Sequence, residues 1–380
     1  MCRAICLIIF SSIDMSSPTQ ISLACLLQSG FTHHDLKDLF LYEKKSTPET
    51  VWKSLKEGIV EHELSEWRKE KILEKSKKVS YEDIEKIILS KNIDIITIED
   101  ARYPERLKNI GHAPYFLYVR GLLRSDIPLI GIVGSRKNTP YATRILEKII
   151  PDTLKAGVGV ISGGATWVDS LAHEITLDHG GYTISVFGTG IDRCYPANNK
   201  KLFETILKKW WALISHFPLG TWPELYNFPI RNEIVAWISN GILIPEAALS
   251  SGTLITAQLA LEHGRDVFAV PGDIDRVTSE WSNMLIATGQ AKIVRCAWDI
   301  LEEYFDLASI GTGMTPIVKT PPTFSNDTEK CIYEAIEWGD TSIDSLLRST
   351  HLEMTDLLTN IAMLEINGHV TIDEMGRYQI

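Results

Sequence analysis

The chain has 380 residues, of which 44% are hydrophobic and 23% charged, with a formal net charge of −11 at pH 7. This composition is typical of a folded soluble protein, and at about 100 to 200 residues per domain the length predicts two or three domains. Six scattered cysteines form no CxxC pair and no zinc-type spacing, which argues against a metal site and favours a reduced, cytoplasmic setting.

The first ten residues, MCRAICLIIF, form a short apolar run with one Arg. No small-residue cleavage site follows, as a signal peptide would require. No other segment approaches the roughly 20 apolar residues that span a bilayer, so we expect no membrane association. We take Met15 as the expected first residue.

The segment 21–90 has apolar residues at three- and four-residue spacing among many Lys and Glu. This period predicts short amphipathic helices, in which Trp52, Leu55, Ile59 and Trp67 are expected to be buried. We therefore expect an N-terminal helical domain over 15–95.

From residue 128 short apolar runs alternate with helical patterns. The expected strands are 129–133, 159–162, 183–187, 212–215, 241–244 and 266–269, and an earlier strand is expected at 115–119 in the connector before them. The expected helices are 139–156, 168–179, 199–209, 228–239 and 254–263. This alternation predicts an α/β fold with a Rossmann-like, doubly wound, mostly parallel sheet over 96–308.

The segment 309–326 is rich in Gly, Thr and Pro and reads as a linker. Three helical patterns follow at 327–338, 342–350 and 353–367, and two short strands at 369–374 and 377–380. Three helices and a hairpin predict a winged-helix module over 327–380.

Several expected strands end in turns rich in Gly, Ser or Thr, and in open parallel sheets ligands bind at these carboxyl ends. Free backbone N–H groups at the following helix starts attract anions. The segment 101–215, which holds most of these turns, is basic, with 15 Lys and Arg against 9 Asp and Glu. A phosphate-bearing ligand is therefore expected at the following residues: Gly134, Ser135, Arg136, Lys137, Ser162, Gly163, Ser251 and Gly252.

Arg136 is the most informative of these residues, because a guanidinium beside free backbone donors suits bidentate phosphate contact. Lys200 and Phe203 pair a cation with an aromatic ring, as single-strand binders do, although a Phe at helical spacing is as readily explained as core. Arg231 and Asn232 stand at an expected helix start and are further candidate phosphate contacts.

Catalytic and cofactor patterns are missing from the sequence. The first turn reads GxxGSRK and not GxGxxG, and neither a GxxxxGK[ST] loop nor a GxSxG elbow occurs. Asp169 and His173 share a helix face, but without a second His or carboxylate they are better explained as a helix-start Asp and a packed His. We expect no cofactor, no metal and no enzymatic activity.

The motifs IGIVGSRKNTPY, ISGGATWVDSLAH, NFPIRNE and PEAALSSGTLITAQLALEHGRDVFAVPG stand in series between residues 103 and 304. In this order they resemble the DNA processing protein A (DprA, or Smf) family. The resemblance implies a Rossmann-like core that binds single-stranded DNA, forms a homodimer and helps to load the RecA recombinase in transformation and recombination. It also implies DNA contacts by Arg136, Lys200 and Phe203.

The chain departs from the family where Trp replaces a usual glycine, at Trp167, Trp237 and Trp281 and at Trp210 or Trp211. Trp167 matters most, because its side chain could fill the crevice that backbone–phosphate contacts need. A decaying gene, an altered codon reading and a real narrowing of the site all remain open as explanations.

Two other functions remain in competition. Rossmann-like enzymes of the lysine-decarboxylase-like type hydrolyse nucleoside monophosphates, but they carry PGGxGTxxE where this chain reads PEAALSSGT. The second competing function is that of a module that only binds proteins. The expected recognition helix at 353–360 holds two acidic residues and no Lys or Arg, which disfavours binding to duplex DNA.

Overall fold

The computed structural model of the chain describes residues 17–44, 46–60, 62–134, 139–248, 252–304, 324, 326–337, 339–367, 369–372 and 377–379. The contacts of the chain divide it into two compact units, 1–313 and 314–380. Among the described residues no helix combines the length and the apolar character that crossing a bilayer requires.

The first unit begins with short helices, as expected. They are α2 (Pro18–Gln28), α3 (His33–Lys37), the π-helix η1 (Asp38–Glu43), α4 (Pro48–Lys56), α5 (Glu66–Ser76) and α6 (Tyr81–Ser90). The hydroxyls of Ser17, Thr32, Thr47 and Ser80 accept backbone N–H bonds at four of the helix starts, which satisfies donors that a helix leaves unpaired there.

The burial predicted for these helices is partly confirmed. Trp52 and Leu55 of α4 are buried. Ile59 and Trp67 are 53% and 62% exposed, so their predicted burial is wrong. Ile59 lies beyond the end of α4, and the ring of Trp67 is covered by the Lys71 ammonium at 3.8 Å instead of by the core.

A nine-stranded sheet follows in the order β1-β2-β6-β5-β4-β3-β7-β8-β9. Its strands are β1 (Asp94–Thr97), β2 (Phe116–Arg120), β3 (Leu129–Ile132), β4 (Gly159–Ser162), β5 (Thr183–Val186), β6 (Ala212–Ser215), β7 (Gly241–Ile244), β8 (Asp266–Ala269) and β9 (Lys292–Ile293). The neighbouring strands in the part of the sheet ordered β6-β5-β4-β3-β7-β8-β9 all pair in parallel. Strand β2 pairs antiparallel with both β1 and β6. The doubly wound, mostly parallel sheet is confirmed.

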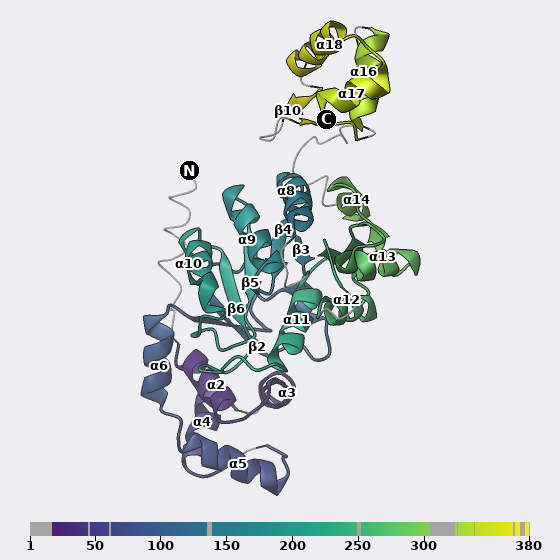
Figure 1. Cartoon of the computed structure of the whole chain (residues 1–380). Coiled ribbons are helices and arrows are strands. Elements are labelled where there is room, and N and C mark those ends of the chain that lie inside the picture. Colours follow the sequence, from purple (N-terminus) through teal and green to yellow (C-terminus); the bar gives the residue numbers. More distant parts are fainter. Residues whose placement is uncertain are drawn as a thin grey trace. The chain divides into compact units, whose positions relative to one another are not determined.

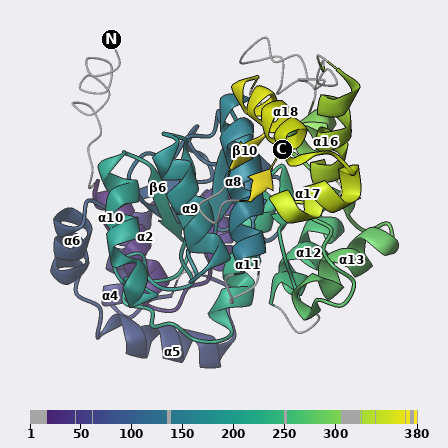
Figure 2. The same ribbon diagram turned by 45° about the horizontal axis from the view of Figure 1, so that its top comes forward.

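Helices cover both faces of the sheet. The longer ones are α8 (Pro140–Lys155), α9 (Val168–Asp178), α10 (Lys200–Lys208), α11 (Asn227–Ile238), α12 (Thr253–Glu262) and α13 (Glu280–Ala287). The short ones are α7 (Glu105–Lys108), η2 (Ala197–Asn199), η3 (Val277–Ser279), α14 (Trp298–Leu301) and η4 (Glu302–Tyr304). Helices α8, α9 and α10 stand side by side along the sheet (Figures 1 and 2), and α11 packs on α12.

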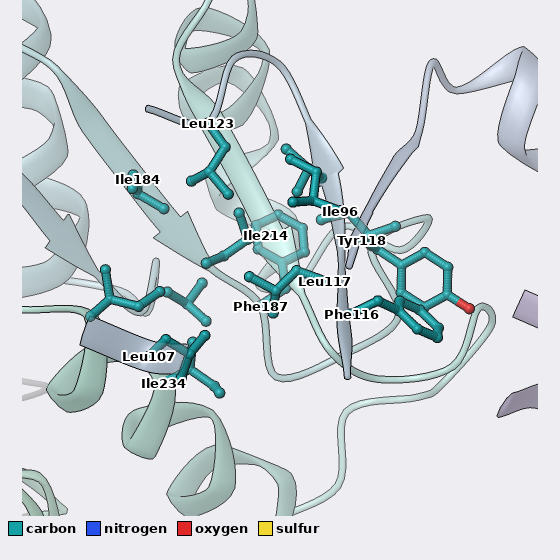
Figure 3. Packing of buried hydrophobic residues seen from close by; sticks show 14 of the residues in the cluster. Ile96, Leu107, Phe116, Leu117, Tyr118, Leu123, Ile184, Phe187, Ile214 and Ile234 are labelled. Carbon is teal, nitrogen blue, oxygen red and sulfur yellow. The ribbon is translucent and has the colours of Figure 1, made fainter. Parts of the chain in front are cut away.

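The N-terminal helices and the sheet share one hydrophobic core. Residues of α2 and α4 belong to the same cluster as Phe116, Leu117 and Tyr118 of β2. Figure 3 shows these β2 side chains beside Ile214 of β6 and Phe187. The parallel strands are buried along their whole length except at the first residue of β8 and in β9, as expected for a sheet covered on both faces.

The second unit contains α16 (Asp327–Glu337), α17 (Ile343–Thr350), α18 (Met354–Ile366) and the antiparallel strands β10 (Thr371–Ile372) and β11 (Tyr378–Gln379). Ile332, Leu346, Leu357 and Tyr378 contribute to its own core. The three expected helices and the strand pair are therefore present. The assignment of this unit as a winged helix, and the four-segment division of the chain, stay predictions.

Candidate nucleic-acid interface

The turns singled out in the sequence meet at one edge of the sheet. Strands β5, β4, β3 and β7 are neighbours and run parallel, so their carboxyl ends lie at the same edge. The turn after β4 contains Gly163 and Gly164, and the turn after β5 contains Gly188. The predicted residues Ser135, Arg136, Lys137 and Ser251 lie outside the described residues.

The turn after β4 is packed from within by Arg231. The side chain of Arg231 is 5% exposed, and its Nη1 donates to the carbonyl oxygens of Gly163 and of Val186, the latter at 2.7 Å. Its Nε donates to Asn232 Oδ1 at 2.9 Å. A Cβ atom on Gly163 would overlap the guanidinium, so a larger residue there would have to displace the Arg231 side chain from these bonds. Arg231 therefore joins the carboxyl ends of β4 and β5 from inside the protein.

Asp169, in the first turn of α9, also faces this turn. Its carboxylate accepts the Ala165 N–H at 3.2 Å, so part of the backbone donor capacity of the turn is already used. Burial raises the pKa of Asp169, while the charge of Arg231 opposes that rise. The prediction that His173 is a packed histidine agrees with its position: it is fully buried, and its Nδ1 lies 2.7 Å from Thr183 Oγ1.

Helix α10 begins beside the same turn. Asn199, directly before the helix, donates through Nδ2 to Gly164 O at 3.0 Å and to Ala165 O at 3.3 Å. Lys200 and Lys201 follow in the first turn of α10, with both residues exposed. Lys200, which the sequence placed after the Gly188–Gly190 turn, is thus an exposed cation at the start of the helix that Asn199 joins to the turn after β4. Its contact with DNA stays a prediction.

Phe203 takes a different place from the one that base stacking would need. It is 4% exposed, and its ring centroid lies 4.7 Å from that of Phe187. Gly164, with a φ of +64°, passes directly over this ring, where a Cβ atom would collide with it. Phe203 is therefore a core residue in this structure, which is one of the two explanations that the sequence left open.

The family model described as DNA recombination-mediator protein A matches residues 94–305. The chain belongs to this family. The Synechocystis protein Smf is 33% identical over 322 residues, which cover 76% of this chain and 80% of the relative. The DNA processing protein DprA of Streptococcus pneumoniae is 39% identical over 209 residues, which cover 55% of this chain and 73% of the relative.

Two solved structures of this family resemble the chain. DprA from Streptococcus pneumoniae superposes with a TM-score of 0.63 and 30% identity, covering 76% of this chain and 99% of the relative. DprA from Helicobacter pylori gives a TM-score of 0.50 and 26% identity, and the match covers 56% of this chain and 96% of the relative. The structure of that relative was determined to explain how it binds single-stranded DNA. The predicted DprA/Smf resemblance is therefore confirmed.

In this DprA/Smf chain Trp167 and Trp210 have left-handed backbones. Trp167 precedes α9 with φ +76° and ψ −114°, and it is 49% exposed, so the indole lies at the surface beside the turn after β4. Trp210 has φ +64° just beyond α10. Because bulky residues rarely adopt positive φ, both positions favour glycine.

The other two replacements lie deeper in the fold. Trp237 in α11 is 4% exposed and meets His263 edge-on at 5.4 Å, and Trp281 in α13 packs against the main core. Among the described residues neither indole N–H finds a hydrogen-bond partner. A buried unpaired donor costs stability, on the order of 1–3 kcal/mol.

Reasoning from the sequence missed Glu246, which follows β7 and is 1% exposed. Its carboxylate accepts hydrogen bonds from the hydroxyls of Thr139 and, at 3.0 Å, Thr278. Arg276 Nη1 lies 3.7 Å from it. The signal was an acid two residues after the end of an apolar strand, behind Pro245. Glu246 connects the start of α8 to η3 across the point where β3 and β7 meet.

Proposed function

We propose that this chain binds single-stranded DNA at the carboxyl edge of its parallel sheet and delivers the strand to a RecA-type recombinase. Family membership supports this proposal, because the family is described as a recombination mediator. The Helicobacter pylori relative supports the choice of a single strand.

The observation that carries the proposal is the position of Lys200 and Lys201. Both cations stand in the first turn of α10, where the helix dipole is positive and repels them. No acidic residue shares that first turn, and Asn199 uses its amide on the neighbouring glycine turn instead of capping the helix. An arrangement that costs stability in the free protein is explained when a polyanion neutralises it.

We infer that the protein acts by binding and without chemistry on the strand. His173, the residue best suited to proton transfer near the turns, is fully buried, and burial lowers its pKa to about 3. The carboxylate of Asp169 is occupied by the Ala165 N–H and the charge of Arg231. Incubation with nucleoside monophosphates should therefore release no free base.

The proposal extends to a homodimer in the cytoplasm and to a role in transformation and recombination. Helix α12 presents Ile255 and Leu261, which are 40% and 37% exposed, as surface that a second copy could cover. Sedimentation should then show a dimer, and Ile255→Asp should shift it to a monomer. Recombinase filament assembly on protein-coated single strands should accelerate with wild type and lag with a variant that does not bind DNA.

The direct test is fluorescence anisotropy with labelled oligo-dT and with duplex of equal length, each at two salt concentrations. We expect oligo-dT to bind more tightly, with an affinity that falls steeply with salt as counterions are released. Lys200→Ala and Arg136→Ala should each weaken binding for all sequences alike. Lys53→Ala, an exposed lysine of α4, is the matched control and should change nothing.

A further inference from the structure

Exposed aromatic rings border the glycine turns. Tyr195, Trp222 and Tyr226, which we call the aromatic surface, are 45%, 65% and 67% exposed. Tyr195 comes from the loop between β5 and α10, and the other two from the loop between β6 and α11. Large exposed rings are costly in water and are typical of binding surfaces.

The two loops that carry these rings are fastened to each other. Arg193 Nε donates to Gly220 O at 2.6 Å, and the Gly220 N–H donates to Asp192 Oδ1 at 2.7 Å. The Arg193 guanidinium also stacks over Trp222, with its carbon 3.8 Å from the ring centroid. The ring of Trp222 is therefore held in place before any ligand arrives, which reduces the entropy lost on binding.

The aromatic surface is continuous with the proposed strand-binding edge. The Tyr195 ring lies 5.7 Å from that of Phe228, which in turn packs against Gly188 in the turn after β5. The Arg231 guanidinium lies 6.0 Å from the Phe228 ring and binds the Gly163 carbonyl. The Gly190 N–H of the same turn donates to the carbonyl oxygen of Thr221, the residue before Trp222, at 3.1 Å. Both loops of the aromatic surface therefore adjoin the turn after β5.

We propose that the aromatic surface stacks the unpaired bases of the bound strand and so sets the preference for single strands over duplex. This inference rests on the proposed function and adds the element that recognises bases. Every base offers a flat face to an aromatic ring, whereas a duplex hides these faces. Arg193 adds a positive charge beside Trp222, which favours a polyanion.

The test compares oligo-dT with an oligomer of equal length in which every base is replaced by an abasic unit. Stacking is worth about 1–3 kcal/mol per base, so Trp222→Ala and Tyr226→Ala should each weaken oligo-dT binding about tenfold. Neither change should alter binding of the abasic oligomer, which retains only phosphates. Trp222→Phe keeps a ring and should retain most of the affinity.

Leu225→Ala is the matched control, because Leu225 is an aliphatic residue of the same loop and 84% exposed. It should leave both affinities unchanged, and unaltered thermal midpoints should show that all variants fold. The inference is wrong if the alanine variants bind oligo-dT as tightly as wild type does, or if they lose affinity for oligo-dT and for the abasic oligomer equally. It is also wrong if the variants lose only their binding to the recombinase. If wild type binds neither oligomer, the proposed function itself fails.

Discussion

The Arg231 guanidinium and the Gly163 carbonyl are bonded inside the fold, 68 residues apart in sequence. Arg231→Ala should lower the free energy of unfolding by about 3 kcal/mol, because it leaves buried carbonyl groups unpaired and Asp169 without its neighbouring positive charge. Urea unfolding measures this loss. Asn232→Ala is the control and should cost far less, and an Arg231→Ala protein as stable as wild type would contradict the structural role of Arg231.

Trp210 occupies a helix-ending motif that suits glycine. The Trp211 N–H donates to Ile206 O at 3.0 Å and the Trp210 N–H to Leu207 O at 3.0 Å, which is the Schellman pattern with Trp210 at its left-handed position. Trp210→Gly should therefore raise the free energy of unfolding by about 1 kcal/mol. Trp67→Gly, at an exposed position inside α5, should lower it, and thermal unfolding separates the two results.

Trp167 combines a left-handed backbone with a bulky side chain at the start of α9. Trp167→Gly should raise stability by about 1–2 kcal/mol and tighten binding of oligo-dT, because it frees the backbone near the glycine turn. Trp167→Ala removes the indole but not the backbone constraint, and it should improve binding without the full gain in stability. If oligo-dT affinity is the same in all three proteins, Trp167 does not narrow the site.

Buried histidines make stability depend on pH. Burial lowers the pKa of His33 to about 4 and that of His216 to about 3, from 6.5, and His33 Nε2 lies 2.8 Å from the His216 carbonyl oxygen. Their folded-state pKa values lie below the unfolded value, so the unfolded chain binds more protons below pH 6.5. Stability should therefore be full above that pH and fall by about 1.4 kcal/mol per pH unit for each histidine toward pH 4. Urea midpoints from pH 8 to 4 measure this slope, and His33→Gln should reduce it.

The parallel sheet was predictable because its strands are short apolar runs separated by amphipathic helices. The strands β1 and β9 were missed. Their positions are fixed by pairing, β1 with β2 and β9 with β8, and β9 has only two residues. A strand that is defined mainly by pairing with a strand distant in sequence need not show a clear apolar pattern of its own.

The positions of the turns that form the candidate site could be predicted from the sequence, but the contacts of their side chains could not. The glycine turns and Lys200 follow from local sequence, because strand ends and helix starts are local features. The inward direction of Arg231 does not, because its carbonyl partners at Gly163 and Val186 are distant in sequence. Phe203 shows the same limit: helical spacing alone did not distinguish a core ring from one that stacks a base, and its contact with Phe187 decides that.

The most direct measurement of strand placement is a crystal structure of the full chain with bound oligo-dT. We predict phosphates within hydrogen-bond distance of Lys200 and of the backbone at Gly164, with bases stacked on Trp222 or Tyr226. A strand bound on α12 or on the 314–380 unit, with the carboxyl edge of the sheet empty, would contradict the proposed function.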